Sequence, residues 1–524
     1  MKNIKYILFT AIILMGLSSC DDWLKVYPEN SQVTETFWTS KEEVESVLLG
    51  GYYYLRGSVE GQLIPWGEER AGCVYSRSGS SLQKFELKST DKISNWGSMY
   101  QIINVANSVL DNAHLAYEAD DTYEKSELNS HYCEAYYLRA LAYFYIVRNW
   151  RDAPLITESY ESDERPYAIA KSEERLLLNQ IKQDLQTAID INAAKERFNT
   201  TWETKGRATV WALHALMADV CLYDKDYEGC IKHADAILNA TSSSAPRFIA
   251  TPSRSAWFSM FNPGNSSESI FELQWNYEEE QTNNLPKLFD DVHTDRKYQV
   301  SMNLVQLMNA EMINVRSKYM GAEGNEWYEY AVRTIFGGYF LGGTREDVAG
   351  ATAAYVWKYC GSRTRSDKRT ATYYDPNYIL YRVSDVMLLK AEALLMRHAG
   401  SQFEDVEAAM ALVNEVRSRA NAEPCIYTTQ SSLNELLDFV YTERMFELLG
   451  EGKAWYDMLR LSRYGVIDGF NYRDMAIQYI VQFNTQAREA WIKSVLSDED
   501  AWYLPIYENE ITSNSLLIQN DYYL

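Results

Sequence analysis

A chain of 524 residues is long enough for two lobes or for one large helical array with a substantial buried core. Its formal net charge of −23 argues against a nucleic-acid partner, because phosphate binding requires a basic face. Hydrophobic residues make up 46 % and charged residues 23 %, as in ordinary globular proteins, but 40 Tyr, 14 Trp and 17 Phe are a heavy aromatic load whose rings must fill a core or face a ligand.

The first twenty residues predict secretion and lipid anchoring. Two lysines precede an apolar run of about a dozen residues, which is too short to span a bilayer as a stable helix and is typical of a secretory leader. Two serines then precede Cys20, a pattern typical of a bacterial lipobox, in which the cysteine is acylated and becomes the new N-terminus. We expect a signal peptide over residues 1–19, a lipidated tether over 20–35, and Cys20 as the anchor. The alternative is a plain cleaved signal with an incidental cysteine.

The later sequence predicts neither a transmembrane helix nor a metal site. No other run reaches the roughly 18 apolar residues that a spanning helix needs. The six remaining cysteines are scattered without a C-x-x-C pair, and no two of the six histidines lie three or four residues apart. We therefore expect no cofactor; the acidity leaves structural calcium possible, but no EF-hand spacing supports it.

Helical periodicity recurs along most of the chain. Ser40 and Glu43 form a predicted capping box that opens a helix reaching Tyr54. Further single helices are predicted over 93–115, 128–150 and 173–191, and helix pairs over 206–240, 381–420 and 433–461.

The pair over 206–240 is about as long as a tetratricopeptide repeat and resembles one. Residues 241–380 differ, because they are rich in Gly, Pro, Ser, Asn and aromatic residues and have a weak helical period. We expect a helical N-terminal region over 36–240, a loop-rich lobe over 241–380 that carries binding, and a helical C-terminal region over 381–524.

Several segments, taken in order, resemble the SusD/RagB family of outer-membrane nutrient-binding lipoproteins. They are Phe37-Trp38-Thr39-Ser40 with Gly50-Gly51-Tyr52, Trp96 with Tyr100 and Ala106-Asn107, Glu134 to Ala140, Gly206 to Thr209, Tyr381 to Val386 with Ala391 to Ala393, Val413 to Arg417, Glu443 to Gly452, Trp455 to Arg460, Leu504-Pro505-Ile506, and Gln519-Asn520. The resemblance is thinnest across residues 241–370.

This resemblance implies an all-α fold of tetratricopeptide-like helix pairs that form a scaffold for a loop-rich binding lobe. It also implies a non-catalytic protein on the outer leaflet of the outer membrane, which captures oligosaccharide and delivers it to a SusC-like TonB-dependent transporter. Asp21 and Asp22 resemble the signal for export to the cell surface. RagB-type members serve peptide uptake, so a peptide ligand is the alternative.

Three carboxylates, Glu443, Glu447 and Glu451, lie at helical spacing and could suggest a glycosidase pair. One helix face places such groups side by side and not across a sugar, so we expect them to pair with arginines. Arg139 and Arg382 are likewise interpreted as buried ties between helices. A glycan-cleaving enzyme and a purely protein-binding scaffold remain rival functions.

Sugar rings have apolar faces that stack on aromatic rings, while polar neighbours bind the hydroxyls. Three segments combine aromatic residues with such neighbours, and Trp66 is the strongest single candidate because Gly, Pro and charges surround it. For each aromatic residue, core packing is the alternative. The predicted ligand-binding residues are Trp66, Arg70, Tyr75 and Arg77 in the first segment, Trp275 and Tyr277 in the second, and Trp327 and Tyr339 in the third.

Overall fold

The computed structural model describes residues 37–160, 166–289, 298–308, 310, 339–341, 354–361, 369–370 and 373–524. Across these residues the chain is mainly helical, and its strands are short. The predicted all-α class is therefore confirmed.

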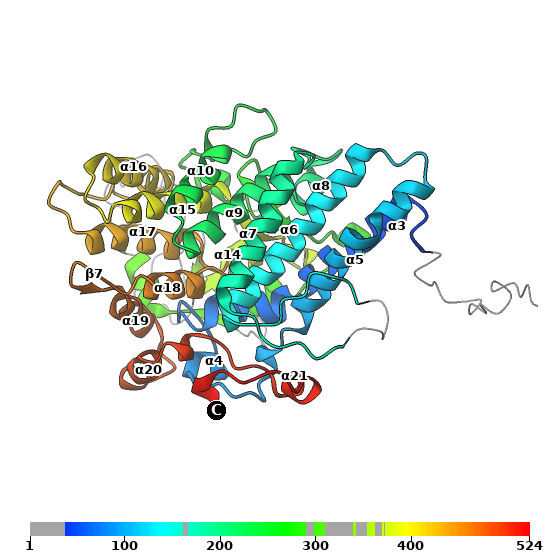
Figure 1. Ribbon diagram of the computed structural model, residues 1–524. Coiled ribbons are helices and arrows are strands. Elements are labelled where there is room, and N and C mark those ends of the chain that lie inside the picture. The colour runs from blue at the N-terminus through cyan, green and yellow to red at the C-terminus, as the bar shows by residue number, and fades with distance from the viewer. Residues whose placement is uncertain are drawn as a thin grey trace, which may run out of the picture.

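The scaffold is a row of helices that pack side by side, mostly in chain order (Figure 1). Its members are α3 (Lys41–Gly57), α5 (Gly97–Ala119), α6 (Lys125–Trp150), α7 (Glu174–Ile191), α9 (Val210–Tyr223), α10 (Tyr227–Leu238), α15 (Val383–Arg397), α16 (Phe403–Arg419) and α17 (Leu433–Glu447). Every predicted single helix corresponds to a member of this row, as do both helices of the pairs over 206–240 and 381–420 and the first helix of the pair over 433–461. The capping box of Ser40 and Glu43 is present, and α3 continues three residues beyond the predicted end at Tyr54.

The second helix of the last predicted pair is α18 (Ala454–Ser462), which α19 (Tyr472–Phe483) and α20 (Glu489–Leu496) follow. Short helical turns connect the larger elements. They are η2 (Val59–Leu63), η3 (Pro65–Glu69), α4 (Ser81–Lys84), η4 (Lys92–Ser94), α8 (Thr201–Gly206), α11 (Arg254–Phe258), η5 (Tyr277–Glu279), α12 (Leu285–Phe289), α14 (Trp357–Cys360), η8 (Asp500–Trp502), α21 (Glu508–Ser513) and η9 (Asp521–Tyr523).

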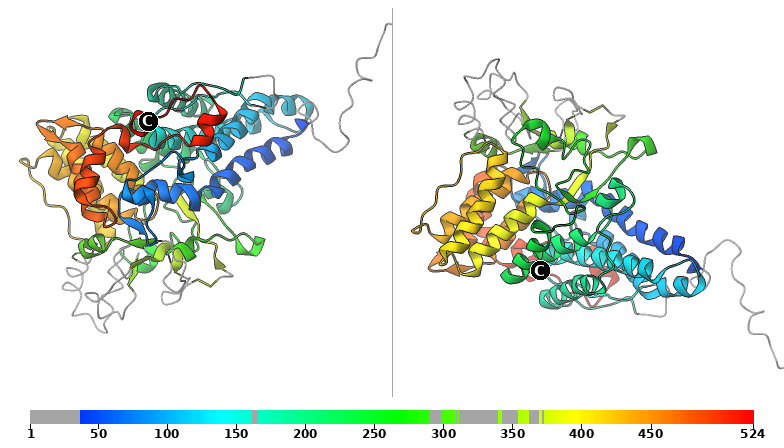
Figure 2. Two further views of the ribbon diagram at one scale, coloured as in Figure 1. Left: turned by 90° about the horizontal axis from the view of Figure 1, so that it is seen from below. Right: turned by 90° about the horizontal axis from the view of Figure 1, so that it is seen from above.

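The strands form antiparallel pairs. They are β1 (Val74–Ser76) with β3 (Tyr298–Val300), β2 (Ser269–Leu273) with β6 (Tyr378–Arg382), β4 (Tyr339–Leu341) with β5 (Ala354–Val356), and β7 (Val466–Ile467) with β8 (Phe470–Asn471). Most of them belong to the predicted loop-rich lobe, whose described segments lie along one side of the helical row (Figure 2).

One predicted helix start is wrong, because Tyr381 and Arg382 end strand β6 and α15 begins one residue later. The strand is a short run of five buried residues, and a run of that length does not distinguish a strand from a helix. The boundaries of the N-terminal, middle and C-terminal regions remain predictions.

Buried arginines tie the elements together: Arg139 joins helices as predicted, whereas Arg382 joins the end of strand β6 to α17 and the segment after it. The Arg139 guanidinium donates to the Asp184 carboxylate at 2.6 and 2.8 Å and to Asn107 Oδ1 at 2.8 Å, which joins α6 to α7 and α5. Arg382 donates to Glu447 Oε1 at 2.6 Å and to Glu451 Oε2 at 2.9 Å. Removing one partner from such a buried pair would leave an uncompensated charge in the core.

The C-terminal segment returns to the N-terminal half. The Leu504 amide donates to the Asn149 carbonyl at 2.6 Å, and the Glu508 amide donates to the Ser89 carbonyl at 2.9 Å. All six cysteines of the described chain are buried and free of disulfides, in keeping with their expected role as small hydrophobic residues. Among the described helices, none is both long and apolar enough to cross a bilayer.

Candidate functional site

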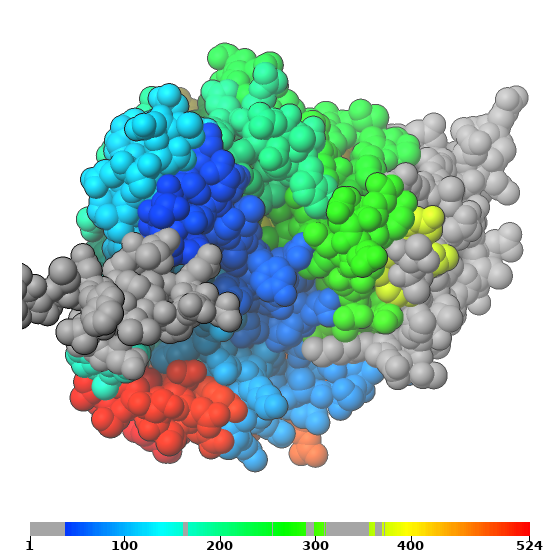
Figure 3. All heavy atoms as spheres, turned by 90° about the vertical axis from the view of Figure 1, so that its right-hand side faces the viewer, coloured from blue at the N-terminus to red at the C-terminus, as the bar shows by residue number. Residues whose placement is uncertain are grey.

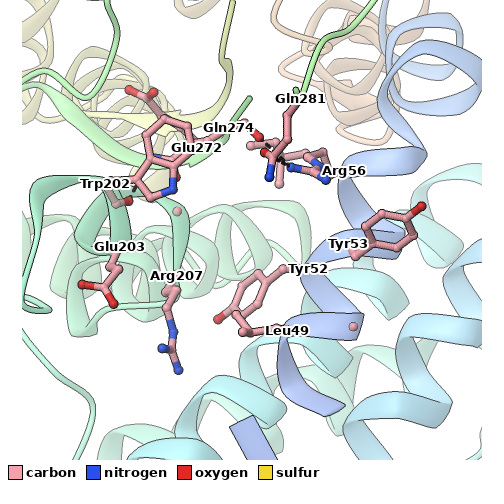
Figure 4. Close-up of a pocket in the computed structure, with 13 residues that line it drawn as sticks. Leu49, Tyr52, Tyr53, Arg56, Trp202, Glu203, Arg207, Glu272, Gln274 and Gln281 are labelled. Atoms are coloured by element: carbon pink, nitrogen blue, oxygen red, sulfur yellow. Dashed lines mark hydrogen bonds between the residues drawn. The ribbon is translucent and has the colours of Figure 1, made fainter. Parts of the chain in front are cut away.

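A cleft of about 550 Å³ opens between α3, α8 and β2, beside the loop that follows η5. Figure 3 shows α3 in blue exposed on one face of the molecule, next to the green segment that contains η5. The residues that line the cleft are Leu49, Gly50, Tyr52, Tyr53, Arg56, Trp202, Glu203, Gly206, Arg207, Glu272, Leu273, Gln274 and Gln281 (Figure 4).

Helix α3 supplies one wall because its two faces differ. Its apolar face packs into the core through Val44, Leu48 and Leu55. Tyr53 is 65 % exposed and Leu49 is 45 % exposed, and both lie four residues apart on the open face. The helix is therefore anchored on one side and presents an aromatic ring to the cleft on the other.

Helix α8 supplies the opposite wall. A capping box between Thr200 and Glu203 fixes its first turn, and Trp202 on that turn is 39 % exposed. A Cβ added to Gly206 would collide with the side-chain amide of Gln274, so glycine permits the close approach of α8 to β2. Gln274 Nε2 also donates to the Trp202 carbonyl at 2.9 Å. These contacts fix the backbone of Trp202, while its indole ring remains partly exposed to the cleft.

Arg56 is the central polar group of the cleft. Its Nη1 donates to Gln281 Oε1 at 2.8 Å and to the Gln274 carbonyl at 3.2 Å (Figure 4). The guanidinium lies 5.6 Å from the Tyr53 ring centre and 5.8 Å from that of Trp275. Partial burial lowers its pKa. Among the described residues no carboxylate pairs with Arg56, so its remaining donors are available to a ligand.

The polar groups at the floor of the cleft are hydrogen-bonded or ion-paired with other protein groups. Tyr52 Oη donates to Glu134 Oε2 at 2.7 Å and accepts from the Ala208 amide at 2.9 Å, and burial together with the Glu134 charge raises the pKa of Tyr52. Arg207 donates to both oxygens of Glu134. Burial raises the pKa of Glu272, which accepts from Asn377 Nδ2 at 2.7 Å. These groups form a rigid base and offer little free charge.

Trp66 and Arg70 are both buried, contrary to the exposure that their choice as ligand-binding residues assumed. Trp66 lies in the π-helix η3 with 0 % of its surface exposed, and its indole Nε1 donates to the Ile93 carbonyl at 2.8 Å. Arg70 is also buried and donates to the Trp502 and Ala501 carbonyls at 2.8 and 2.7 Å. Surface exposure was the reason for choosing both residues, and that expectation is wrong. We therefore do not include them in the candidate site.

Tyr75 lies in strand β1, where it pairs with Gln299 of β3, and Arg77 directly follows that strand. Tyr75 is half-buried and its hydroxyl donates to Gln299 Oε1 at 2.9 Å, while Arg77 is exposed. Neither residue lines the cleft. Their role in ligand binding stays a prediction.

Trp275 and Tyr277 lie beside the cleft. Trp275 is buried behind Arg56, so it positions the guanidinium and does not offer its own face. Tyr277 is half-buried and packs edge-on against Tyr373 at 4.6 Å between ring centres. Of the remaining predictions, Cys20 and Trp327 lie outside the described residues; Tyr339 is described only as backbone, in strand β4, where it pairs with Val356.

Tyr53, Arg56 and Trp202 are not among the ligand-binding residues that the sequence predicts. One signal was available, because three consecutive tyrosines on an amphipathic helix cannot all face the core. The contribution of α8 depends on a contact with β2 that no local pattern reveals.

The three carboxylates on α17 and after it are structural. Glu443, Glu447 and Glu451 are all buried, and each is paired with cations. Their partners are Arg417 for Glu443, Arg382 and Arg419 for Glu447, and Arg382 and Lys358 for Glu451. The predicted pairing with arginines is confirmed, and none of the three faces the cleft.

Two family models together match most of the chain. Residues 267–523 match the model described as the SusD family, and residues 22–222 match the model described as starch-binding associating with outer membrane. The chain therefore belongs to the SusD-like family, as the sequence motifs indicated.

Relatives with known sequences match nearly end to end. A SusD-like protein of Formosa agariphila is 26 % identical over 509 residues, which cover 88 % of this chain and 93 % of the relative. A SusD-like protein of Bacteroides ovatus is 25 % identical over 525 residues, which cover 95 % of this chain and 88 % of the relative.

Solved structures share the fold. A SusD superfamily protein of Bacteroides thetaiotaomicron gives a TM-score of 0.71 at 20 % identity, covering 93 % of this chain and 99 % of that one. A structure described as a laminarin binding SusD-like protein gives a TM-score of 0.67 at 20 % identity, covering 92 % of this chain and 99 % of that one.

Proposed function

We propose that this protein is a non-catalytic glycan receptor, anchored in the outer membrane through an acylated Cys20 and exposed on the cell surface. It captures oligosaccharide and delivers it to a SusC-like TonB-dependent transporter. The observation that carries the proposal is the cleft, in which two open aromatic rings, Tyr53 and Trp202, accompany the free donors of Arg56.

The chemistry of the cleft suits a neutral sugar. Tyr53 and Trp202 offer apolar faces for the CH faces of a pyranose ring, and Arg56 and Gln281 offer donors and an acceptor for hydroxyl groups. The paired charges of the floor give no strong attraction for an ionic ligand. The family description and the laminarin-binding structural neighbour support a glycan as the ligand class.

Calorimetric titration of the full chain in detergent, against laminarin, starch and a peptide digest, tests this proposal. We expect saturable binding to a glycan without release of reducing ends, and weaker binding for Trp202→Ala. Trp491→Ala is the matched control, because Trp491 is a similarly exposed indole on α20, at the other end of the molecule (Figure 1).

Three outcomes would contradict the receptor proposal or redirect it. Release of reducing ends would indicate a glycan-cleaving enzyme. Binding to the peptide digest alone would favour the RagB-like alternative. Glycan binding that Trp202→Ala leaves unchanged would move the site away from the cleft.

The anchor has its own test. Cys20→Ser should abolish metabolic labelling by palmitate and release the protein from the outer-membrane fraction, since no thiol would remain at the predicted acylation position. Cys73→Ser is the matched control, because Cys73 is buried. Co-purification of a TonB-dependent transporter with the anchored chain would test the delivery partner.

A further inference from the structure

A second hollow of about 340 Å³ lies between α3 and α5, beyond the cleft. Its lining residues are Tyr54, Gly97, Tyr100, Gln101, Asn104 and Val105. The lining contains no charged side chain, and two of its members are tyrosines. It therefore has the polar and aromatic character of the cleft without the arginine.

The two hollows meet at a pair of consecutive tyrosines on α3. Tyr53 lines the cleft and Tyr54 lines the second hollow. Their ring centres are 6.1 Å apart with the planes at 67°, and Tyr54 is 39 % exposed. The two rings thus form a continuous aromatic ridge across the helix.

The polar groups of the second hollow are placed for hydroxyl groups. Gln101 is exposed, and within the described chain its side chain makes no hydrogen bond. Asn104 Oδ1 accepts from the Tyr160 amide at 2.8 Å, which orients its side chain and leaves its Nδ2 group as a donor. The Tyr100 hydroxyl is already engaged, since it donates to the Pro154 carbonyl at 2.7 Å.

We propose that one glycan chain crosses the Tyr53–Tyr54 ridge and occupies both hollows, so that the protein selects for long chains over short ones. This inference rests on the proposed glycan function. A neutral polyhydroxylated polymer fits both hollows, because each combines an exposed aromatic ring with hydrogen-bonding groups. These groups are Arg56 and Gln281 in the cleft, and Gln101 and Asn104 in the second hollow. Once one part of the glycan is bound in the cleft, binding of the next part in the second hollow is intramolecular. A chain long enough to fill both hollows therefore binds more tightly than a chain that fills one.

The test is a titration of laminari-oligosaccharides from disaccharide to heptasaccharide, with laminarin as the polymer, on the full chain in detergent. Affinity should rise with length until both hollows are filled. Tyr54→Ala should weaken binding of the heptasaccharide and laminarin about two- to tenfold and leave the disaccharide unchanged, as the loss of one stacked ring predicts. Gln101→Ala should act in the same direction and tests the hollow without removing an aromatic ring.

The site variants separate this inference from the function on which it rests. Trp202→Ala should weaken short and long chains alike, because both use the cleft. Affinity that is independent of length, or heptasaccharide binding unchanged in both Tyr54→Ala and Gln101→Ala, would overturn the second hollow and leave the receptor intact. Absence of binding to every laminari-oligosaccharide, laminarin and starch would overturn both proposals.

Discussion

Two arginines on neighbouring segments, Arg56 and Arg70, have opposite roles although each lies beside aromatic rings. The guanidinium carbon of Arg70 is 3.8 Å from the ring centre of Trp455, and two of its nitrogens donate to main-chain carbonyls in the core. Burial lowers its pKa to about 10. Arg56 contacts Tyr53 and Trp275 at longer range and keeps donors that face the cleft.

The comparison shows that an arginine beside aromatic residues does not by itself mark a binding site. What distinguishes a binding arginine is whether its guanidinium N–H groups are all taken up by acceptors within the protein or remain open to a ligand. Carbonyl acceptors from a distant part of the chain make Arg70 a structural tie, whereas the partial exposure of Arg56 leaves it able to bind hydroxyl groups. The same distinction separates Trp66 from Tyr53.

Replacing the buried Trp66 and replacing the exposed Tyr53 should have very different effects on stability. Trp66→Ala should lower the free energy of unfolding by about 3–5 kcal/mol, because it empties a filled core position and strands the Ile93 carbonyl. Tyr53→Ala should change it by less than about 0.5 kcal/mol, because most of that ring is exposed. Urea denaturation followed by circular dichroism measures both.

The outcome also bears on the site. A Trp66→Ala protein that keeps wild-type stability but loses glycan binding would reverse the comparison and restore Trp66 as a ligand contact. A Tyr53→Ala protein as unstable as Trp66→Ala would mean that the cleft wall belongs to the core.

A second, smaller effect concerns Glu68, which lies between Trp66 and Arg70. Burial raises the pKa of this carboxyl to about 8. Its Oε1 accepts from the Gly452 amide at 2.7 Å, whereas Oε2 has no hydrogen-bond partner among the described residues. Because the folded-state pKa exceeds the ordinary value of 4.5, folding favours the protonated acid.

The contribution of Glu68 to stability is therefore fully present below about pH 4.5 and is lost as the pH rises to about 8. Glu68→Gln should remove that loss, so the variant should gain stability over the wild type progressively across this range, by a few kcal/mol, since each pKa unit corresponds to about 1.4 kcal/mol. Unfolding measured from pH 5 to pH 9 tests the sign. A difference between variant and wild type that does not change with pH would contradict it. Exposed Glu489→Gln is the control.

Sequence patterns predicted the helical row because helix formation is mostly local. The capping box of Ser40 and Glu43 and the periodicity of α6 and α7 are each contained in one segment. The strand pair β2 and β6 joins residues more than a hundred positions apart, and no local pattern distinguishes Tyr381 as strand from Tyr381 as helix.

The candidate site could be predicted less well for the same reason. The segment that contains Trp66 has the Gly, Pro and charges of a surface loop. It can nevertheless be buried, because groups distant in the sequence form hydrogen bonds with its charged side chains. Glu68 accepts from Gly452, Glu69 accepts from Tyr298, and Arg70 donates to Trp502. Conversely, nothing local to Trp202 indicates that Gly206 and Gln274 would bring its helix against the end of a strand.

Replacing Arg56 should scarcely change stability but should weaken glycan binding. Arg56→Met keeps the apolar stem and removes every donor, so the free energy of unfolding should change by less than about 0.5 kcal/mol. Glycan affinity should fall up to about tenfold, as the loss of hydrogen bonds to a sugar predicts. Calorimetric titration of the variant with laminarin measures this loss.

Arg56→Lys then separates geometry from charge. Lysine retains the positive charge but lacks the planar fork of donors, so its affinity should be close to that of Arg56→Met if the ligand is a neutral glycan held by the fork. Recovery of wild-type affinity by lysine would instead indicate that charge attracts the ligand. In that case the cleft binds an acidic glycan, and Arg56, whose charge no described carboxylate neutralises, determines its specificity.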